Sequence, residues 1–133
     1  TPDGLYVQEA SWGLGQANLN LGAYAAASAA FEQALAIDKG TDVAAKSRYC
    51  LGMTAAMAGD TAQARMEFLV VDPLYPTYPE WAASALIRAA RTALDDGMPD
   101  KAIGDLERIL ARYGDTPAAG EARELQAQIS GQQ

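Results

Sequence analysis

Few residues of this 133-residue chain have the types and spacing that catalysis requires. The adjacent carboxylates Asp95 and Asp96 resemble an acid–base or metal-binding pair, but they precede Gly97, where a helix is predicted to end. A solvated turn is the simpler interpretation. Gly13-Leu14-Gly15 lacks the third glycine of a dinucleotide-binding loop, and it is predicted to lie inside a helix instead of after a strand. Both patterns therefore indicate structure and not chemistry.

Nucleophiles and metal ligands are also scarce. The chain has no histidine and one cysteine, Cys50, so no imidazole is available as a base or as a zinc ligand. A single cysteine excludes an internal disulfide, and its apolar neighbours favour a small buried side chain. We therefore expect no enzyme activity and no cofactor.

The negative charge of the chain argues against two classes of partner, nucleic acids and anionic membranes. Seventeen acidic and ten basic residues give a net charge of −7, which disfavours nucleic acid and anionic membrane surfaces. Residues 10–31 carry no charge, yet their asparagines, glutamine and glycines are too polar for a membrane span. We expect a soluble chain without membrane insertion. Because it does not begin with Met, it is expected to be a processed product or a piece of a longer protein.

The strongest pattern is an internal repeat. Three copies share a small residue, a later glycine and a large apolar residue: Gly15, Gly22 and Phe31; Gly52, Gly59 and Phe68; and Ala90, Gly97 and Leu106. The second copy follows the first by 37 positions, and the third follows the second by 38. Self-similarity at this period indicates stacked supersecondary units.

Each copy is typical of two helices joined by a turn. The small residue lies two helical turns before the turn glycine, where two helices can approach closely, and we expect Gly15 and Gly52 to touch a facing helix backbone. The turn glycines suit a left-handed residue after a helix end. Buried stripes are predicted on the second helices, at Ala27, Phe31 and Ala34; Ala64, Phe68 and Val71; and Ala102, Leu106 and Ile109.

Start and stop signals predict seven helices, at about 2–21, 24–37, 42–59, 60–71, 78–96, 99–113 and 117–130. Thr1 is the expected first N-cap, and capping boxes are expected at Asp60 with Gln63 and at Thr77 with Glu80. Residues 72–79 hold three prolines and are predicted to be the longest non-helical connection. The last helix carries a narrow apolar stripe of Ala118, Ala122, Leu125 and Ile129.

With these residues the chain resembles the tetratricopeptide repeat (TPR) family. The resemblance implies an all-α, right-handed α-solenoid in a single domain, 1–133, with repeats at about 8–41, 42–75 and 80–115 and a C-terminal capping helix at about 117–130. The chain departs from the family pattern because its large aromatic residue stands two residues before the leucine instead of three. Residues 111–125 are similar to repeat variants of bacterial envelope proteins, which favours the periplasm or cell envelope over the cytoplasm.

In this family the first helices of successive repeats line a concave groove. The resemblance places nine residues there: Trp12, Gln16, Leu19, Tyr49, Met53, Met57, Ile87, Arg88 and Arg91. A bound segment is expected to bring apolar side chains to the first two repeats and a carboxylate to the arginines of the third. The resemblance matches the family's carboxylate clamp only at Arg88, because Trp12 and Gln16 stand at its lysine and asparagine positions.

Two hypotheses for function follow. The first is a non-enzymatic scaffold that binds a peptide or protein segment of unknown identity in the groove. The second is a structural spacer or self-association module of a larger cell-envelope protein, which leaves a homo-oligomer open. In the plainer interpretation, Trp12, Tyr49 and Met53 only pack against neighbouring helices, and the arginines only balance Asp95 and Asp96.

Overall fold

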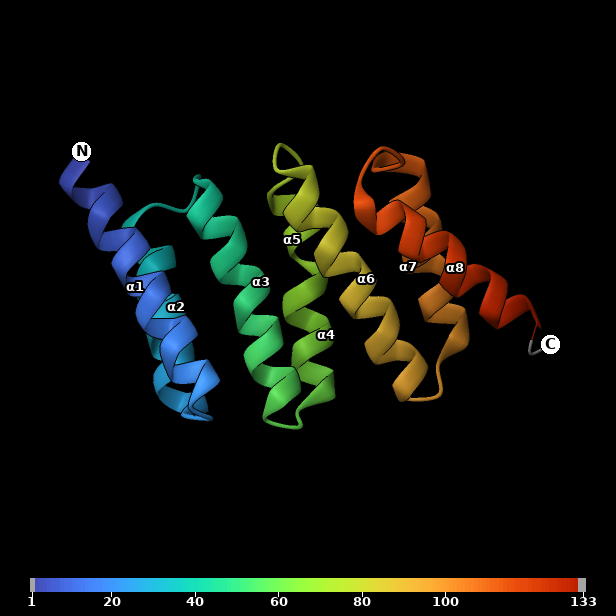
Figure 1. Ribbon diagram of the computed structural model, residues 1–133, viewed down its shortest axis with the longest axis horizontal. Coiled ribbons are helices and arrows are strands. Elements are labelled where there is room, and N and C mark those ends of the chain that lie inside the picture. Colours follow the sequence, from blue (N-terminus) through green and yellow to red (C-terminus); the bar gives the residue numbers. More distant parts are fainter. Residues whose placement is uncertain (1, 132–133) are drawn as a thin grey trace. The chain divides into compact units, whose positions relative to one another are not determined.

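The computed structural model describes residues 2–131, with side chains from residue 4 onward, and all its regular elements are helices (Figure 1). They are α1 (Pro2–Asn20), α2 (Tyr24–Ile37), α3 (Asp42–Met57), α4 (Thr61–Leu69), α5 (Val71–Leu74), α6 (Pro79–Asp95), α7 (Pro99–Arg112) and α8 (Pro117–Gly131). No strand occurs among these residues, and the predicted all-α fold class is confirmed. The expected N-cap Thr1 lies outside the described residues.

The short helix α5 is the main departure from the predicted elements. Three of its four residues, 72–74, lie in the segment predicted to be non-helical, and the first, Val71, was predicted to end the helix before it. Val70 keeps right-handed helical backbone angles (φ −81°, ψ −14°), so the chain makes one more turn before it extends. Pro73 is tolerated because it lies in the first turn of α5, where a backbone N–H has no intrahelical partner. Val71 therefore belongs to α5 and not to α4, but it is fully buried, as Ala64 is, and Phe68 is 1% exposed, so all three residues predicted for this stripe are buried.

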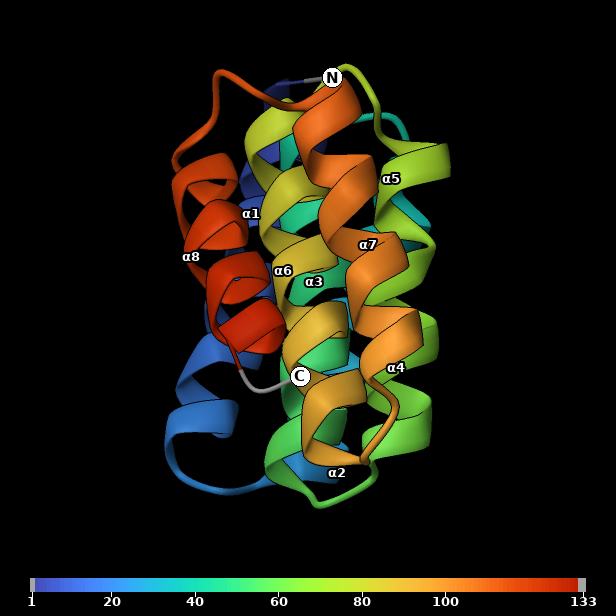
Figure 2. The ribbon, with the colours of Figure 1, turned by 90° about the vertical axis from the view of Figure 1, so that its right-hand side faces the viewer.

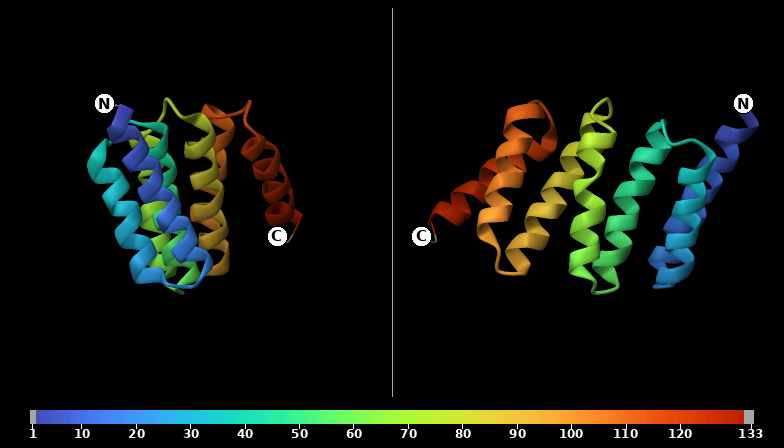
Figure 3. Two further views of the ribbon diagram at one scale, coloured as in Figure 1. Left: turned by 60° about the vertical axis from the view of Figure 1, so that its left-hand side comes forward. Right: turned by 180° about the vertical axis from the view of Figure 1, so that it is seen from behind.

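The chain divides into two compact units within α4: unit 1 ends at Glu67, and unit 2 begins at Phe68. In unit 1, α1 packs against both α2 and α3, and α2 packs against α3. The left panel of Figure 3 shows these three helices as neighbours. The stripe predicted on α2 is confirmed, because Ala27, Phe31 and Ala34 are fully buried.

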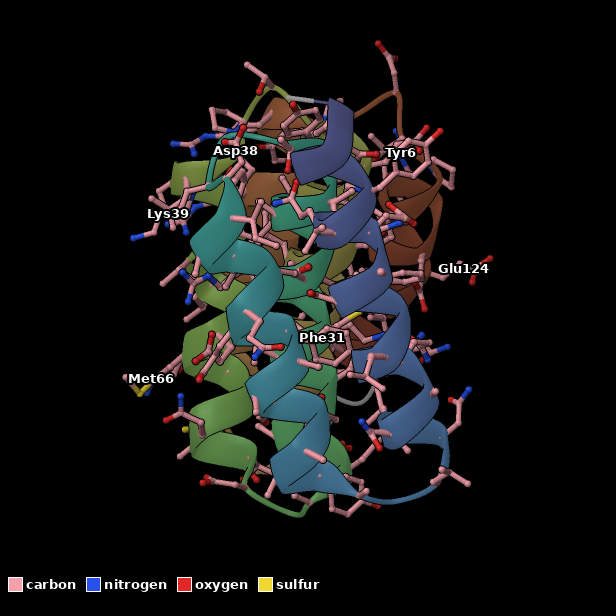
Figure 4. The ribbon with its side chains drawn as sticks, turned by 90° about the vertical axis from the view of Figure 1, so that its left-hand side faces the viewer. Tyr6, Phe31, Asp38, Lys39, Met66 and Glu124 are labelled. Carbon is pink, nitrogen blue, oxygen red and sulfur yellow. The ribbon has the colours of Figure 1, made fainter. Side chains whose placement is uncertain are left out.

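Close packing of α1 on α2 depends on a glycine. A Cβ atom built on Gly15 would lie 2.6 Å from the ring of Phe31, so no other residue fits without movement of that ring. Figure 4 shows Phe31 between the two helices. The predicted close contact is therefore present, but its partner is an aromatic side chain and not the helix backbone. The reason is that the large residue of the repeat fills the space that the missing side chain leaves.

A buried glutamine joins the three helices of unit 1. The Gln8 side chain, in α1, donates hydrogen bonds to the backbone oxygens of Ala34 (2.9 Å) and Asp38 (2.7 Å) at the end of α2. It accepts one from the Thr41 hydroxyl (2.9 Å), which also caps α3 by accepting from the backbone N–H of Ala44 (3.0 Å). Gln8 is fully buried, and its amide satisfies groups that the turn between α2 and α3 leaves without backbone partners.

The three predicted glycine turns are confirmed. Gly22, Gly59 and Gly97 have positive φ angles of 77°, 88° and 72°. Each glycine N–H bonds to the carbonyl three residues back, and the next N–H bonds to the carbonyl five residues back, as in a Schellman motif. The same turn therefore closes the first helix of all three predicted repeats.

The predicted helix starts are confirmed only in part. Asp60 accepts a hydrogen bond from the backbone N–H of Gln63 (3.1 Å), but the Gln63 side chain donates to Glu67 instead of returning to Asp60. The Asp60 N–H is already bonded to the carbonyl of Ala55, so it has no need of Gln63. The prediction of a capping box at Thr77 is wrong. Tyr78 is the N-cap residue of α6 and makes no side-chain capping hydrogen bond, because Pro79 is the first helical residue.

In unit 2, α6 packs against α5, α7 and α8, and α7 packs against α8. Figure 2 shows α6, α7 and α8 side by side. The stripes predicted on α7 and α8 are confirmed, since their members are buried: Ala102, Leu106 and Ile109 in α7, and Ala118, Ala122, Leu125 and Ile129 in α8.

A buried carboxylate holds α5 to the end of α7. Asp72 is 2% exposed, and its two oxygens accept from the Arg112 guanidinium (2.9 Å) and from the Tyr113 hydroxyl (2.5 Å). Burial, followed by the hydrogen bond to Asp72 and its negative charge, raises the pKa of Tyr113 to about 12, although the Arg112 charge opposes the shift. The phenol therefore stays protonated and continues to donate its hydrogen bond at neutral pH.

Candidate binding faces

The predicted binding residues of unit 1 lie on adjoining stripes of α1 and α3. We call this surface the α1–α3 face and define it by Trp12 and Gln16 of α1 and by Lys46, Tyr49, Met53 and Met57 of α3. On α3 these residues recur every three or four positions, which places them on one side of the helix. Trp12, Gln16, Tyr49 and Met53 are half-buried, and Met57 is 50% exposed.

Trp12 is held in place by α3. Its indole N–H points at the Cys50 sulfur, 3.4 Å away, and the Lys46 ammonium lies 3.8 Å from the centroid of its ring. Lys46 also forms an ion pair with Glu9 of α1 (3.0 Å). These contacts fix the indole between two helices and leave part of its surface accessible. The packing interpretation accounts for these contacts of Trp12 without any ligand.

Cys50 lies beneath this face. It is 6% exposed, as its apolar neighbours predict. Its sulfur also lies 3.9 Å from the Gln16 side-chain oxygen, to which the thiol donates. Burial raises the pKa of Cys50, although the Trp12 hydrogen bond and the Lys46 charge act in the opposite direction. At neutral pH the group is therefore a thiol that bridges α1 and α3, and its nucleophilic thiolate form is disfavoured.

Two predicted groove residues offer almost no surface. Leu19 is 4% exposed and Ile87 is 5% exposed, so both belong to the core. Their prediction as surface residues is wrong, because an aliphatic side chain on a helix between two others is used for packing.

The predicted basic end lies on α6 in unit 2. Arg88 is exposed there, and Arg91 is 44% exposed on the side chain. The Arg91 guanidinium donates to the carboxylate of Glu121 in α8, from Nε at 3.1 Å and from Nη2. The partner of Arg91 is therefore an acid of the last helix, whereas the sequence indicated Asp95 or Asp96 of its own helix as the alternative to a ligand.

Glu9 is a residue of this region that was not predicted from the sequence. It stands 37 positions before Lys46, so the ion pair joins equivalent positions of the first two repeats. Opposite charges at equivalent positions of neighbouring repeats are the signal that could have found it, since such positions lie side by side when repeats stack.

Two further properties of the described residues concern metal binding and membrane crossing. Among the side chains that the structure describes, from residue 4 to residue 131, no group of three or more Cys, Asp or Glu is arranged to hold a metal ion. Over the same residues, the structure contains no helix with the length and apolar character that crossing a membrane requires.

Comparison with known proteins identifies the repeat. A family model described as tetratricopeptide repeat matches residues 6–42 and 87–130, which together are more than half of the chain. A search of curated proteins found no match. Residues 43–86 lie between the two matches, and their turn at Gly59 repeats the hydrogen bonds of the turns at Gly22 and Gly97. TPR repeats generally mediate protein–protein interactions and are typically non-catalytic scaffolds. The chain therefore belongs to the tetratricopeptide repeat family.

Proposed function

We propose that the chain is a non-enzymatic scaffold that binds a peptide or protein segment on the α1–α3 face of unit 1. The observation that carries this proposal is a row of half-exposed aromatic and thioether side chains on a repeat whose family binds proteins: Trp12, Tyr49, Met53 and Met57. Aromatic residues supply much of the binding energy at protein interfaces, and methionine adapts its shape to different partners.

The contacts of Trp12 favour an apolar segment. Lys46 is neutralised by Glu9 and is only 15% exposed on its side chain, so it contributes little free charge to the face. Its ammonium and the Cys50 sulfur fix the indole before any ligand arrives. A fixed anchor loses less conformational entropy on binding, which strengthens an interaction made by a small number of side chains.

Arg88 and Arg91 of unit 2 are a separate proposed contact, for a carboxylate. Arg91 would have to exchange Glu121 for the carboxylate of a ligand. The net free energy that Arg91 contributes to binding is then the difference between two similar charge-assisted interactions, one with Glu121 and one with the ligand. This difference is smaller than the free energy of either interaction alone. We therefore assign the larger part of the binding energy to the α1–α3 face.

The test uses peptides selected from a random library displayed on phage, with the immobilised chain as the target. The affinity of a selected peptide is then measured for the wild type, Tyr49→Ala and Met57→Ala. Loss of an aromatic anchor should weaken binding by about 2 kcal/mol, and loss of the methionine by less. Met57 is half-exposed, so its variant is expected to fold even if Tyr49→Ala does not.

Tyr6→Ala is the matched control, because Tyr6 is a 78% exposed tyrosine of α1 outside this face. Its affinity should equal that of the wild type. A selected peptide that binds Tyr49→Ala and Met57→Ala as tightly as the wild type would reject the α1–α3 face as the binding surface.

The second candidate function is a spacer or self-association module of a larger bacterial cell-envelope protein. The similarity of residues 111–125 to envelope-type repeats supports that location. Self-association is favoured by a different observation, the exposed leucines on the other side of α1: Leu14 is 56% exposed and Leu21 is 81% exposed.

A further inference from the structure

A chain of hydrogen bonds runs along the α1 side of the α1–α3 face. The Trp12 indole donates to the Cys50 sulfur (3.4 Å), and the Cys50 thiol donates to the side-chain oxygen of Gln16 (3.9 Å). The side-chain nitrogen of Gln16 donates in turn to the side-chain oxygen of Asn20 (3.2 Å), about one helical turn further along α1. We call these four residues the Trp12–Asn20 relay. All its hydrogen bonds run in one direction, from Trp12 towards the end of α1.

The relay decides which polar atoms its two amides present to a ligand. The side-chain oxygens of Gln16 and Asn20 each accept one hydrogen bond of the relay, which fixes the orientation of both amide groups. One N–H of Gln16 and both N–H groups of Asn20 lie outside the relay. Gln16 is half-buried and Asn20 is exposed, so a ligand can reach these groups. The α1 side of the face therefore carries a row of hydrogen-bond donors.

The α3 side of the face carries thioethers beside these amides. Met53 stands 37 positions after Gln16. Met57 stands 37 positions after Asn20, which is the spacing at which an ion pair already joins α1 to α3 (3.0 Å). Equivalent positions of neighbouring repeats lie side by side when the repeats stack. The face is therefore divided lengthwise into a donor row on α1 and an apolar row on α3.

The spacing within both rows matches an extended chain. Residues four apart on a helix are separated by about 6 Å along its axis. Alternate residues of an extended segment are about 6.4–6.8 Å apart, and their carbonyl groups point to the same side. An extended segment that follows α1 can therefore bring alternate carbonyls to the donor row and alternate side chains to the apolar row. A helix cannot do this, because its own backbone already uses its carbonyls.

We infer that the α1–α3 face binds an extended peptide segment whose main-chain carbonyls accept hydrogen bonds from Gln16 and Asn20. Apolar side chains at alternate positions of the segment pack on Met53 and Met57. This inference rests on the proposed function, because it specifies the conformation and chemistry of the segment that the α1–α3 face binds.

Alanine substitution in the peptide tests the conformation of the segment. The library-selected peptide is the probe, and each of its residues is replaced in turn before its dissociation constant for the wild-type chain is measured. An extended segment should lose affinity at positions i and i+2, because its side chains alternate between two faces. A bound helix would instead lose affinity at positions i, i+3 and i+4.

Asn20→Asp tests the donor row. It keeps the size of the side chain but replaces the N–H donors by a carboxylate oxygen, so a peptide carbonyl then meets an acceptor. The dissociation constant should rise about tenfold. Asn18→Asp is the matched control, because it makes the same change of charge in the same helix at a position about 200° away around the axis. It should bind the peptide as the wild type does.

Replacement of single amides of the peptide by esters tests the main-chain contacts. An ester carbonyl is a weaker acceptor than an amide carbonyl, so two ester positions, two residues apart, should each lower the affinity for the wild type. One of these two esters should have little further effect on binding to Asn20→Ala. A double-mutant cycle with this variant then assigns that carbonyl to Asn20.

Three outcomes would overturn the inference. They are affinity losses at helical spacing, equal affinities of Asn20→Asp and Asn18→Asp, and ester effects that Asn20→Ala leaves unchanged. If Tyr49→Ala and Met57→Ala still weaken binding in these cases, the α1–α3 face remains the binding surface and only the extended segment is rejected. If neither variant weakens binding, the peptide binds elsewhere and both proposals are rejected.

Discussion

Gly13 and Gly15, both in α1, differ in the space available for a side chain. A Cβ atom on Gly15 would lie 2.6 Å from the Phe31 ring, whereas a Cβ atom on Gly13 would meet no atom within 4 Å. Gly15→Ala should therefore lower the free energy of unfolding by roughly 1–3 kcal/mol through overpacking. Gly13→Ala should raise it by up to about 1 kcal/mol, because alanine favours the helix.

Urea unfolding of both variants measures this contrast. A double-mutant cycle with Phe31→Leu identifies the cause, since the smaller side chain should remove part of the cost of Gly15→Ala. Equal effects of the two glycine substitutions would show that the Gly15–Phe31 contact is not tight.

The second prediction at this scale concerns Tyr113 and alkaline pH. Its folded-state pKa of about 12 lies above the ordinary value of 10.0, so the protonated phenol contributes its full stability below pH 10 and loses it as the pH rises towards 12. Tyr113→Phe should cost about 1–3 kcal/mol at neutral pH, because Asp72 loses one of its two hydrogen-bond donors.

Between pH 10 and pH 12, the stability of the wild type should fall towards that of Tyr113→Phe. Denaturant unfolding at several pH values measures the difference, and Tyr6→Phe, at an exposed tyrosine, is the control. Parallel curves for the wild type and Tyr113→Phe over this range would contradict the assignment.

Single residues could be predicted from the sequence where the repeat marks them. Gly15, Phe31 and Gly22 recur at a fixed distance, and each has the role that its side chain, or the lack of one, implies. Gln8 and Asp72 could not be predicted in this way. A lone polar residue in a helix is usually solvated, and only the fold shows that Gln8 meets the end of a second helix.

At the scale of elements, helix ends follow from turn chemistry. The sequence predicts the bounds of α2 at Tyr24 and Ile37 because a glycine turn precedes this helix and Asp-Lys-Gly follows it. The same reasoning failed for α5, because three prolines between residues 72 and 79 suggested an extended segment. A proline restricts the residue before it but is compatible with the first turn of a helix, and the sequence did not separate these two cases.

Gln8 supplies a test of how α1, α2 and α3 are held together. Gln8→Leu keeps the approximate size of the side chain but removes partners from the Ala34 and Asp38 carbonyls and from the Thr41 hydroxyl. We expect a loss of about 2 kcal/mol or more in the free energy of unfolding, because these polar groups are left unsatisfied. Gln33→Leu, on the exposed surface of α2, is the control and should have little effect. Similar losses for both variants would mean that the Gln8 hydrogen bonds do not stabilise the unit.

At the scale of the whole molecule, the chain belongs to a family whose repeats generally mediate protein–protein interactions. From the first helices of the repeats, the sequence predicted which residues line the groove. It could not tell which of these residues are exposed and which are buried. Leu19 and Met53 have similar apolar character, and only their packing decides that the first is core and the second is half-exposed. The proposed α1–α3 face is the part of the predicted groove in unit 1 that retains accessible surface.

The four methionines of the chain allow the most direct test of this binding face. Met53 and Met57 belong to it, whereas Met66 in α4 and Met98 before α7 lie outside it. In a protein labelled with ¹³C at the methionine methyl groups, a library-selected peptide is titrated and the four methyl signals are followed by NMR, after assignment with single Met→Leu variants. We predict saturable shifts of the Met53 and Met57 signals, with Met66 and Met98 unchanged. Saturable binding that leaves Met53 and Met57 unshifted would contradict the proposed binding face.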